Sequence, residues 1–262
     1  MRERQLKHIG SSGASYPSLR DKRVIVSGGG SGIGAALVEA FAAQGARVAF
    51  VDIQDDESKR LCKALADHPH APLYRRSDIA DTGRYIETLG GLMDEIGGCD
   101  IMLNNAASDD RHEIAEVTPE QWDSRMAVNL KHLFFAAQAV APKMQAAGGG
   151  SIVNFGSISW HLGLENLSIY QTAKAAIEGL TRSLARELGQ DNIRVNCVVP
   201  GNVQTPRQQR WYTPEAEAEI VKAQCLDGRI QPHDIAAMAL FLASDDARFC
   251  TGHNYWVDAG WR

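Results

Sequence analysis

RVIVSGGGSGIGAALVEAFAAQ, residues 23–44, decides the fold of this 262-residue chain. A β-branched run at 23–27 is typical of a buried strand, residues 28–34 supply five glycines in seven positions, and 35–44 is helical in composition. This order places free backbone amides and the positive end of a helix dipole where a pyrophosphate can bind. The GxGxxA pattern at Gly30, Gly32 and Ala35 is a weak signal alone, but its position between a strand and a helix favours nucleotide binding.

Strands and helices alternate along the rest of the chain. Strands are expected at 23–27, 47–52, 72–76, 101–104, 151–155, 194–199 and 254–257. Helices are expected at 35–44, 56–66, 81–96, 118–145, 167–188 and 232–243. The alternation predicts an α/β fold, a Rossmann-type doubly wound parallel sheet of about seven strands with helices on both faces.

The chain is expected to form a single domain after a short leader. A flexible leader at 1–18 precedes a single domain at 19–262. Residues 202–228 show poor periodicity and contain Pro206, Pro214 and several aromatic residues. Because long irregular segments within compact domains are often functional, we expect a substrate lid around 202–228.

Composition and charge narrow the classes of partner. With 44% hydrophobic residues, 23% charged residues and a net charge of −5, the chain resembles an ordinary soluble protein without an electrostatic reason to bind nucleic acid or anionic membranes. Its five scattered cysteines form no CxxC pair, which suits a reducing cytoplasm, and its eight histidines show no metal-ligand spacing. We therefore expect a small-molecule substrate, no metal, and a cytoplasmic location.

The stretch SISWHLGLENLSIYQTAK, residues 157–174, holds the candidate reactive groups. Tyr170 and Lys174 are four residues apart, so in a helix their side chains share one face. A neighbouring ammonium lowers the pKa of a phenol toward the range of a general base, which could remove a proton from an alcohol. Taken alone, this spacing is more often an ordinary amphipathic pair.

Polar residues also follow the second and fourth strands. Asp52 ends the second strand, where a carboxylate can bind the adenosine ribose hydroxyls and repel a 2′-phosphate. Since Ile53, Gln54 and the glycine turn carry no Arg or Lys, NAD is favoured over NADP. Asn104 and Asn105 follow the fourth strand, at the sheet edge where such folds bind ligands.

Together these residues resemble the classical short-chain dehydrogenase/reductase family from about Leu19 to the end of the chain. The glycine pattern is matched by Ser27, Gly28, Gly32 and Gly34, the asparagine motif by Asn104, Asn105 and Ala106, and the catalytic set by Asn129, Ser157, Tyr170 and Lys174. Two positions depart from the family, Ser27 where Thr is usual and Ala107 where Gly is usual. The resemblance implies cofactor contacts from Gly28, Ser31, Gly32, Ile33, Gly34, Asp52, Ile53, Asp78, Ile79, Asn105, Ala106, Tyr170, Lys174, Pro200, Gly201, Val203 and Thr205.

Stretches outside the shared motifs are similar to those of sugar 1-dehydrogenases in this family. They are SDDRH at 108–112, NFGSISWHLGLENL at 154–167, VVPGNV at 198–203 and CTGHNYWVDAGWR at 250–262. They are rich in hydrogen-bonding and aromatic groups, which suits a polyhydroxylated substrate. The candidate substrate-binding residues are Asp109, Ser157, Trp160, His161, Glu165, Tyr170, Asn202, Gln208 and Trp211.

The resemblance implies NAD-dependent oxidation of an aldopentose, D-xylose favoured, at C1 to the lactone. Tyr170 would act as general base, Ser157 would stabilise the charge on the same oxygen, and Lys174 would lower the Tyr170 pKa and bind the nicotinamide ribose. Asn129 would hold a water. The family also implies a homotetramer.

Other functions fit the same sequence. The substrate could be L-arabinose, D-galactose or L-fucose, or the enzyme could reduce a ketoacyl or ketosteroid compound, although the polar stretches disfavour apolar substrates. A non-catalytic NAD-binding regulator is a further alternative. It would not need the four catalytic residues.

Overall fold

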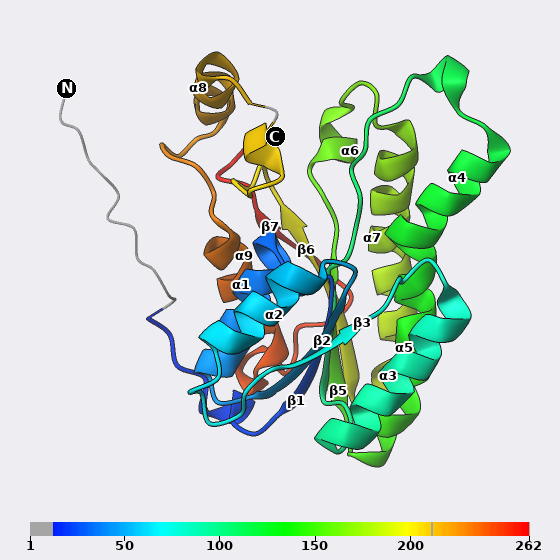
Figure 1. Ribbon diagram of the computed structural model, residues 1–262, viewed down its shortest axis with the longest axis vertical. Coiled ribbons are helices and arrows are strands. Elements are labelled where there is room, and N and C mark those ends of the chain that lie inside the picture. The colour runs from blue at the N-terminus through cyan, green and yellow to red at the C-terminus, as the bar shows by residue number, and fades with distance from the viewer. Residues whose placement is uncertain (1–12, 211, 262) are drawn as a thin grey trace.

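The computed structural model describes residues 13–210 and 212–261, and its centre is one parallel sheet (Figure 1). The strands are β1 Arg23–Ser27, β2 Arg47–Asp52, β3 Leu73–Arg76, β4 Ile101–Asn104, β5 Gly150–Phe155, β6 Ile193–Pro200 and β7 Asn254–Val257. Their order across the sheet is β3-β2-β1-β4-β5-β6-β7, and every neighbouring pair is parallel. The predicted seven-stranded, doubly wound fold is confirmed.

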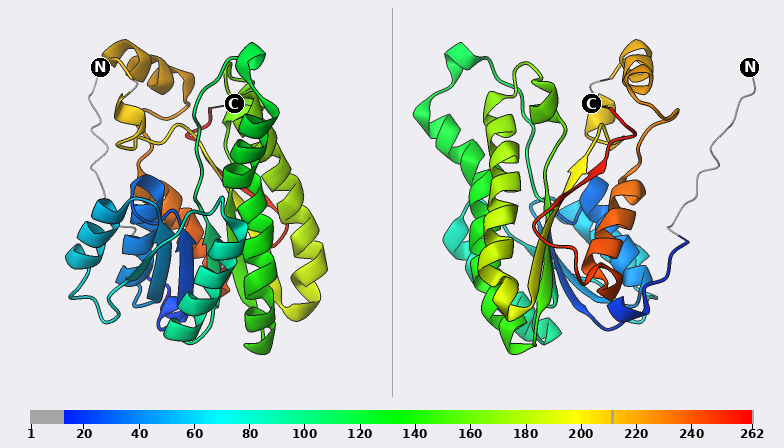
Figure 2. Two further views of the ribbon diagram at one scale, coloured as in Figure 1. Left: turned by 45° about the vertical axis from the view of Figure 1, so that its right-hand side comes forward. Right: turned by 180° about the vertical axis from the view of Figure 1, so that it is seen from behind.

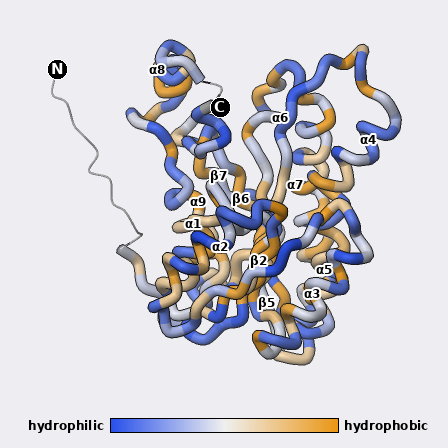
Figure 3. Tube along the Cα trace, viewed as in Figure 1, coloured by the Kyte–Doolittle hydropathy of each residue, from blue (hydrophilic) through white to orange (hydrophobic). Residues whose placement is uncertain are grey.

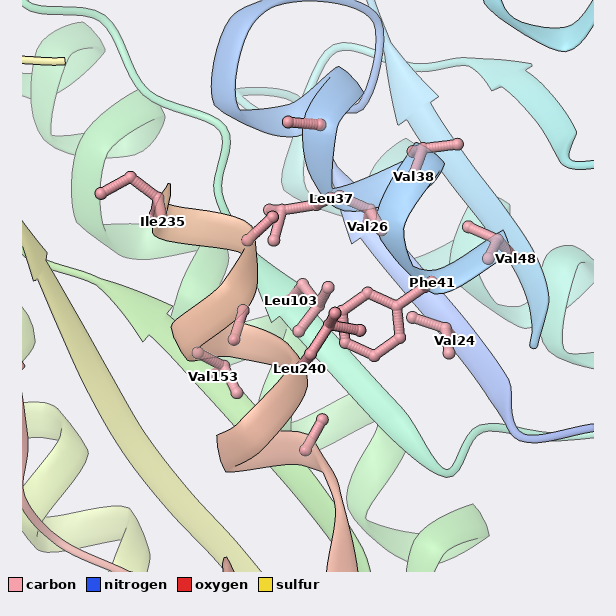
Figure 4. Packing of buried hydrophobic residues seen from close by; sticks show 14 of the residues in the cluster. Val24, Val26, Leu37, Val38, Phe41, Val48, Leu103, Val153, Ile235 and Leu240 are labelled. Carbon is pink, nitrogen blue, oxygen red and sulfur yellow. The ribbon is translucent and has the colours of Figure 1, made fainter. Parts of the chain in front are cut away.

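The sheet lies between two layers of helices (Figure 2). Alternate residues of its strands pack into the two cores on opposite faces. Val24 and Val26 of β1 belong to a core with α1 (Gly32–Ala43) and α9 (Pro232–Ala243), shown close up in Figure 4. The intervening Ile25 belongs to a second core on the other face. Helix α2 (Asp55–Ala64) lies beside α1 in Figure 1.

The second face is covered by α3 (Thr82–Ile96), α5 (His132–Ala146) and α7 (Ser168–Leu188). Hydrophobic residues run along β2 and β5 between the two layers (Figure 3). Burial on both faces explains why these strands are nearly continuous apolar runs.

The helix expected at 118–145 is interrupted. Thr118 caps α4 (Pro119–Met126) through a capping box with Gln121, as predicted. A π-helical turn at Ala127–Lys131 then separates α4 from α5. Such turns insert a residue into the helix and often occur at functional sites.

The segment expected to be irregular, 202–228, contains helix. A 3₁₀ turn lies at Gln208–Arg210, and α8 spans Pro214–Ala223, with its first turn capped by the side chain of Thr213. The base of the segment is fixed, because Val203 forms a parallel bridge with Ile230 and the Gln204 N–H donates to the Ile230 carbonyl at 2.8 Å. Residues 202–228, which we call the cover, are therefore partly helical, and backbone hydrogen bonds fix the two ends of the segment to each other.

The chain before β1 is attached to the domain earlier than the predicted boundary at residue 18. Tyr16 packs on the first core, its N–H donates to Gln44 at 2.8 Å, and Pro17–Leu19 forms a 3₁₀ turn. None of the helices in the described ranges is long and apolar enough to cross a membrane.

Candidate active site

The candidate site lies at the carboxyl ends of β1, β4, β5 and β6, which meet at the upper edge of the sheet in Figure 1. After β1 the chain continues to β2 and β3 on one side, and it returns to β4 on the other side. This reversal of strand order leaves a crevice outside the strand ends, where ligands bind in open α/β sheets.

The reactive groups come from the end of β5 and from α7. Ser157 lies two residues after β5, and Tyr170 and Lys174 lie one turn apart in α7. The Lys174 side chain is buried, donates from Nζ to the Phe155 carbonyl at 2.7 Å, and lies 5.3 Å from the centre of the Tyr170 ring. The predicted pair is therefore adjacent in space, and Ser157 is close enough to hydrogen-bond the phenol.

The pKa shifts of this pair differ from the sequence-based expectation. Burial raises the pKa of Tyr170, and the charge of Asp109 raises it further. The bond with Ser157 and the charge of Arg207 lower it. Burial also lowers the pKa of Lys174 to about 8, because a charged ammonium is disfavoured away from water.

Asn129 is buried in the π-helical turn and binds the segment that follows β4. Its Oδ1 accepts from the Ser108 N–H at 2.9 Å, and its Nδ2 donates to the Ser108 carbonyl at 3.0 Å. Both amide atoms thus bind the backbone of one position, Ser108. The water-holding role of Asn129 stays a prediction, because Nδ2 keeps a second N–H and Oδ1 a second lone pair for such a bond.

The glycine turn forms a cradle that fits a dinucleotide. A Cβ at Gly28, where φ is +68°, would lie 2.8 Å from the Ala106 Cα, and a Cβ at Gly34 would overlap the Gly28 carbonyl oxygen. Ser31 is the N-cap of α1 but makes no side-chain bond to the helix N–H groups. The first-turn amides of Gly32, Ile33 and Gly34 therefore remain suited to a phosphate.

Asp52 stands at the adenosine side of this cradle. It is 7% exposed, and it accepts from the N–H of Gly30 at 2.8 Å and of Gln54 at 2.9 Å. A basic residue that is distant in the sequence also lies near Asp52. It is Arg76 at the end of β3, which donates to the Ile53 carbonyl at 3.2 Å. Arg76 also pairs with Asp55 at 3.2 Å, which partly neutralises it.

The turn after β4 is joined to the glycine turn. Asn105 Nδ2 donates to the Gly28 carbonyl at 2.9 Å, and the Ala106 N–H donates to the Ser27 hydroxyl at 3.2 Å. The bond from Ala106 needs only a hydroxyl at position 27, so Ser27 can make it as well as the Thr that is usual in the family. Ala107 is not among the described non-glycine residues with positive φ, so its backbone does not require glycine.

The remaining predicted cofactor residues gather around the same edge. Pro200 ends β6, and the N–H of Gly201, the next residue, donates to the Val257 carbonyl at 2.9 Å. Thr205 lies 3.3 Å from where a Gly32 Cβ would be, so the cover meets the glycine turn. On the adenosine side, Ile53 is exposed, Ile79 is buried, and Asp78 is exposed with Oδ1 accepting from the Ala80 N–H.

Asp109 connects the catalytic pair to the cover. Its carboxylate accepts from Gln208 Nε2 at 3.0 Å and pairs with Arg207 at 3.1 Å. Its charge acts on the pKa values of both Tyr170 and Lys174. Of the predicted substrate residues, Asp109 and Gln208 are therefore brought to the reactive groups, and the sequence analysis missed Arg207.

Other predicted substrate residues have different partners. Trp160 Nε1 and His161 Nε2 both bond to Glu178 of α7, at 2.8 and 2.9 Å, so these two nitrogens are already engaged. Asn202 donates to the Tyr212 hydroxyl at 2.8 Å and accepts from Arg229 at 2.7 Å.

Two further predicted substrate residues, Glu165 and Trp211, have no described side-chain contact with the reactive groups. The Glu165 side chain is exposed, and its carbonyl accepts from Arg111 at 3.2 Å. Trp211 lies outside the described residues. Within 13–210 and 212–261, no three His, Cys, Asp or Glu side chains are grouped as ligands for a metal ion.

A buried histidine supports the same turn and was not predicted. His132, one turn after Asn129, bonds through Nε2 to the Ala106 carbonyl at 3.1 Å. Burial and the nearby charge of Lys174 lower its pKa to about 3. His132 is therefore a neutral support beneath the turn that follows β4.

Comparison with known proteins places this geometry in a family. The chain matches the family model described as "Enoyl-(Acyl carrier protein) reductase" over residues 28–262. It is 60% identical over 251 residues to D-xylose 1-dehydrogenase of Caulobacter vibrioides, covering 96% of this chain and 100% of that protein. It is 49% identical over 253 residues to "Probable galactose dehydrogenase GalD" of Rhizobium meliloti, covering 94% and 97%.

Solved structures share the fold. A 7α-hydroxysteroid dehydrogenase complexed with NADH and 7-oxo glycochenodeoxycholic acid superposes with a TM-score of 0.89 at 30% identity, covering 94% of this chain and 96% of that one. A short-chain type dehydrogenase/reductase from Mycobacterium ulcerans gives a TM-score of 0.88 at 27% identity, covering 95% and 91%.

Proposed function

The chain belongs to the short-chain dehydrogenase/reductase family, and from this premise we propose that it oxidises D-xylose at C1 to the lactone with NAD as the hydride acceptor. The observation that carries the reaction type is the meeting of Ser157, Tyr170 and Lys174 at the sheet edge that also holds the glycine cradle. The 60% identity to a D-xylose 1-dehydrogenase, which extends over nearly all of both chains, supports the choice of sugar.

The proposed roles of the reactive residues follow from their surroundings. Tyr170 removes the proton from the C1 hydroxyl as general base, and Ser157 donates a hydrogen bond to the same oxygen. Lys174, whose pKa of about 8 keeps it mostly protonated at neutral pH, places a positive charge 5.3 Å from the phenol ring and favours the phenolate. Bound in the cradle formed by the glycine turn and Asp52, the dinucleotide would supply the acceptor for the hydride that leaves C1.

A nicotinamide dinucleotide is the cofactor of this family member, and we propose that it is NAD. Asp52 supports this preference, because two backbone N–H groups hold its carboxylate at the end of β2. A 2′-phosphate there would face that negative charge. Arg76, which could attract such a phosphate, is paired with Asp55.

Asp109 and Gln208 are the residues that we propose to contact the sugar. A carboxylate accepts hydrogen bonds from hydroxyls and an amide both accepts and donates them, and Gln208 of the cover bonds to Asp109, whose charge acts on Tyr170. D-galactose is the second candidate substrate, because the chain is 49% identical to the galactose dehydrogenase relative. Epimers differ by a few such contacts.

An NADH absorbance screen tests the proposal directly. Initial rates with D-xylose, L-arabinose, D-galactose and L-fucose are compared with NAD and with NADP, and a keto-steroid is assayed in the reductive direction. We expect the highest kcat/KM with D-xylose and NAD. A higher kcat/KM with another sugar would replace the substrate, and a preference for NADP would reject the role given to Asp52.

We further propose a homotetramer in the cytoplasm, as family resemblance implies. Phe134 on α5 is 44% exposed and Phe249 is 91% exposed, so apolar side chains are available for subunit contacts. All five cysteines are free, which is compatible with a reducing compartment. Light scattering during size-exclusion chromatography should give about four times the 28.5 kDa chain mass.

A further inference from the structure

Glu178 organises a hydrogen-bond cluster next to the catalytic residues. It lies one helical turn beyond Lys174 in α7, and its side chain is only 11% exposed. Its Oε1 accepts from Trp160 Nε1 at 2.8 Å and bonds His161 Nε2 at 2.9 Å, while Oε2 accepts from Asn254 Nδ2 at 2.5 Å. One carboxylate therefore ties together α7, β7 and the short helix α6 (Ser159–Leu162).

The rings around this carboxylate pack against one another in tilted arrangements. The centroids of Trp160 and His161 are 3.6 Å apart, and those of His161 and Trp256 are 4.3 Å apart. Helix α6 has only four residues, and so short a helix is not stable by itself. Its position consequently depends on contacts with α7 and β7, and the Glu178 bonds are the polar part of those contacts.

Helix α6 in turn fixes the hydroxyl of Ser157. The Ser159 N–H, at the start of α6, donates to Ser157 Oγ at 3.1 Å, and the Ile158 N–H donates to the Pro200 carbonyl at 3.1 Å. An oxygen that accepts this bond keeps its own proton free to donate elsewhere. The placement of α6 thus sets the direction in which Ser157 offers its proton.

The Glu178 carboxylate also lies beside Gly156, the residue that precedes Ser157. A Cβ at Gly156 would be 3.6 Å from Glu178 Oε1, which is ordinary contact distance. The backbone entering the Ser157 turn and the helix leaving it are therefore both beside the same side chain.

We propose that Glu178 is a positioning residue for Ser157. By holding Trp160 and His161 it keeps α6 in place, and α6 keeps the Ser157 hydroxyl aimed at the reacting oxygen. Loss of this anchor should slow the chemical step and leave the distant cofactor cradle intact. The inference rests on the dehydrogenase function and on the role of Ser157 proposed above.

Hydrogen exchange measured by mass spectrometry tests the anchor without requiring activity. In the full-length chain, Glu178→Ala should speed amide exchange in a peptide covering residues 157–163 at least tenfold. Glu178→Gln, which keeps the size and one acceptor oxygen, should have a smaller effect. The matched control is Glu187→Ala, at an exposed position in the same helix, which should leave this peptide unchanged. Unchanged exchange in both Glu178 variants would overturn the proposal.

A double-mutant cycle with Ser157→Ala tests the functional link. Glu178→Ala should lower kcat at least tenfold while KM for NAD stays within twofold, and in the Ser157→Ala background it should lower kcat less than twofold. Equal losses in both backgrounds would show that Glu178 does not act through Ser157. If the wild-type chain reduces NAD with none of the sugars, the proposed function fails, and the exchange result still decides whether Glu178 anchors α6.

Discussion

Replacing Gly34 by Ala should damage both the stability of the fold and its affinity for the dinucleotide. The added Cβ would overlap the Gly28 carbonyl oxygen and would lie 2.8 Å from Asn105 Nδ2. Neither neighbour can yield easily, because the first is backbone and the second is bonded to it at 2.9 Å. Helix α1 must therefore move away from the turn, and it carries the first-turn amides with it.

The size of the effect follows from these contacts. Overpacking of a tight site costs roughly 1–3 kcal/mol, and loss of the bond between Asn105 and Gly28 costs about 1 kcal/mol. The sum, roughly 2–4 kcal/mol, corresponds to a fall in Tm of roughly 5–15 °C for a domain of this size. Because the amides move, the Kd for NADH should rise at least tenfold, which is about 1.4 kcal/mol.

The measurement is thermal unfolding followed by circular dichroism, with NADH binding followed by fluorescence. The matched control is Gly179→Ala, at an exposed position in α7 where nothing lies within 4 Å of the added Cβ. That change should stabilise the protein by about 0.5–1 kcal/mol, because Ala favours a helix over Gly. A Gly34→Ala protein with the Tm and NADH affinity of the wild type would refute the close approach of α1 to the turn.

Three further outcomes are expected. Tyr170→Phe should lower kcat about 10²- to 10⁴-fold with unchanged circular dichroism, and near-normal turnover would mean that another group is the base. Asp109→Asn should lower the pKa of Tyr170, since the Asp109 charge raises it, and the rise of kcat/KM with pH should move to lower pH. Arg207→Met should move that rise to higher pH, because the Arg207 charge lowers the same pKa. Shifts in the opposite directions would contradict this electrostatic arrangement. His132 has a folded-state pKa of about 3, below its ordinary value of 6.5, so the unfolded chain binds its proton first and stability is lost as pH falls below 6.5. Urea unfolding at pH 6.5 and pH 5 should show wild type losing about 2 kcal/mol more than His132→Gln, and equal losses would mean that His132 is not held neutral.

Much of the sheet could be predicted from local sequence. The strands at 23–27, 47–52, 101–104 and 254–257 and the helix at 232–243 have the predicted bounds. Their apolar runs end at glycine, proline or polar residues, so the hydrophobic pattern and the turn-forming residues indicate the same boundaries.

The interruptions were not predictable in the same way. The π-helical turn at Ala127–Lys131 leaves the apolar periodicity of 118–145 largely intact, so the sequence favoured one continuous helix. Helix α8 is not predicted, although Thr213, Pro214 and Glu215 repeat the start signal found at Thr118, because the residues that follow have weak apolar periodicity.

The candidate site divides along similar lines. Tyr170 and Lys174 are neighbours through helix geometry alone, and their proximity was predicted. The partners of Trp160 and of Asp109 depend on which distant segments meet, since the bond between Gln208 and Asp109 joins residues 99 positions apart. The pKa of Tyr170 is raised rather than lowered because burial, which a sequence does not quantify, outweighs the bond with Ser157 and the charge of Arg207.

The pinned base of the cover has a consequence for protein engineering. Val203 and Ile230 are held together by their own backbone bridge, independently of what the intervening chain does. A replacement segment that starts at Val203 and ends at Ile230 would have its two ends held together by the same bridge. Moderate differences in its length would then add little to the entropy cost of closing the loop. The interval between the anchors can therefore be exchanged as a cassette that keeps Thr205, which lies against the glycine turn, so that a library of such segments could change sugar selectivity while the sheet and the dinucleotide cradle stay constant.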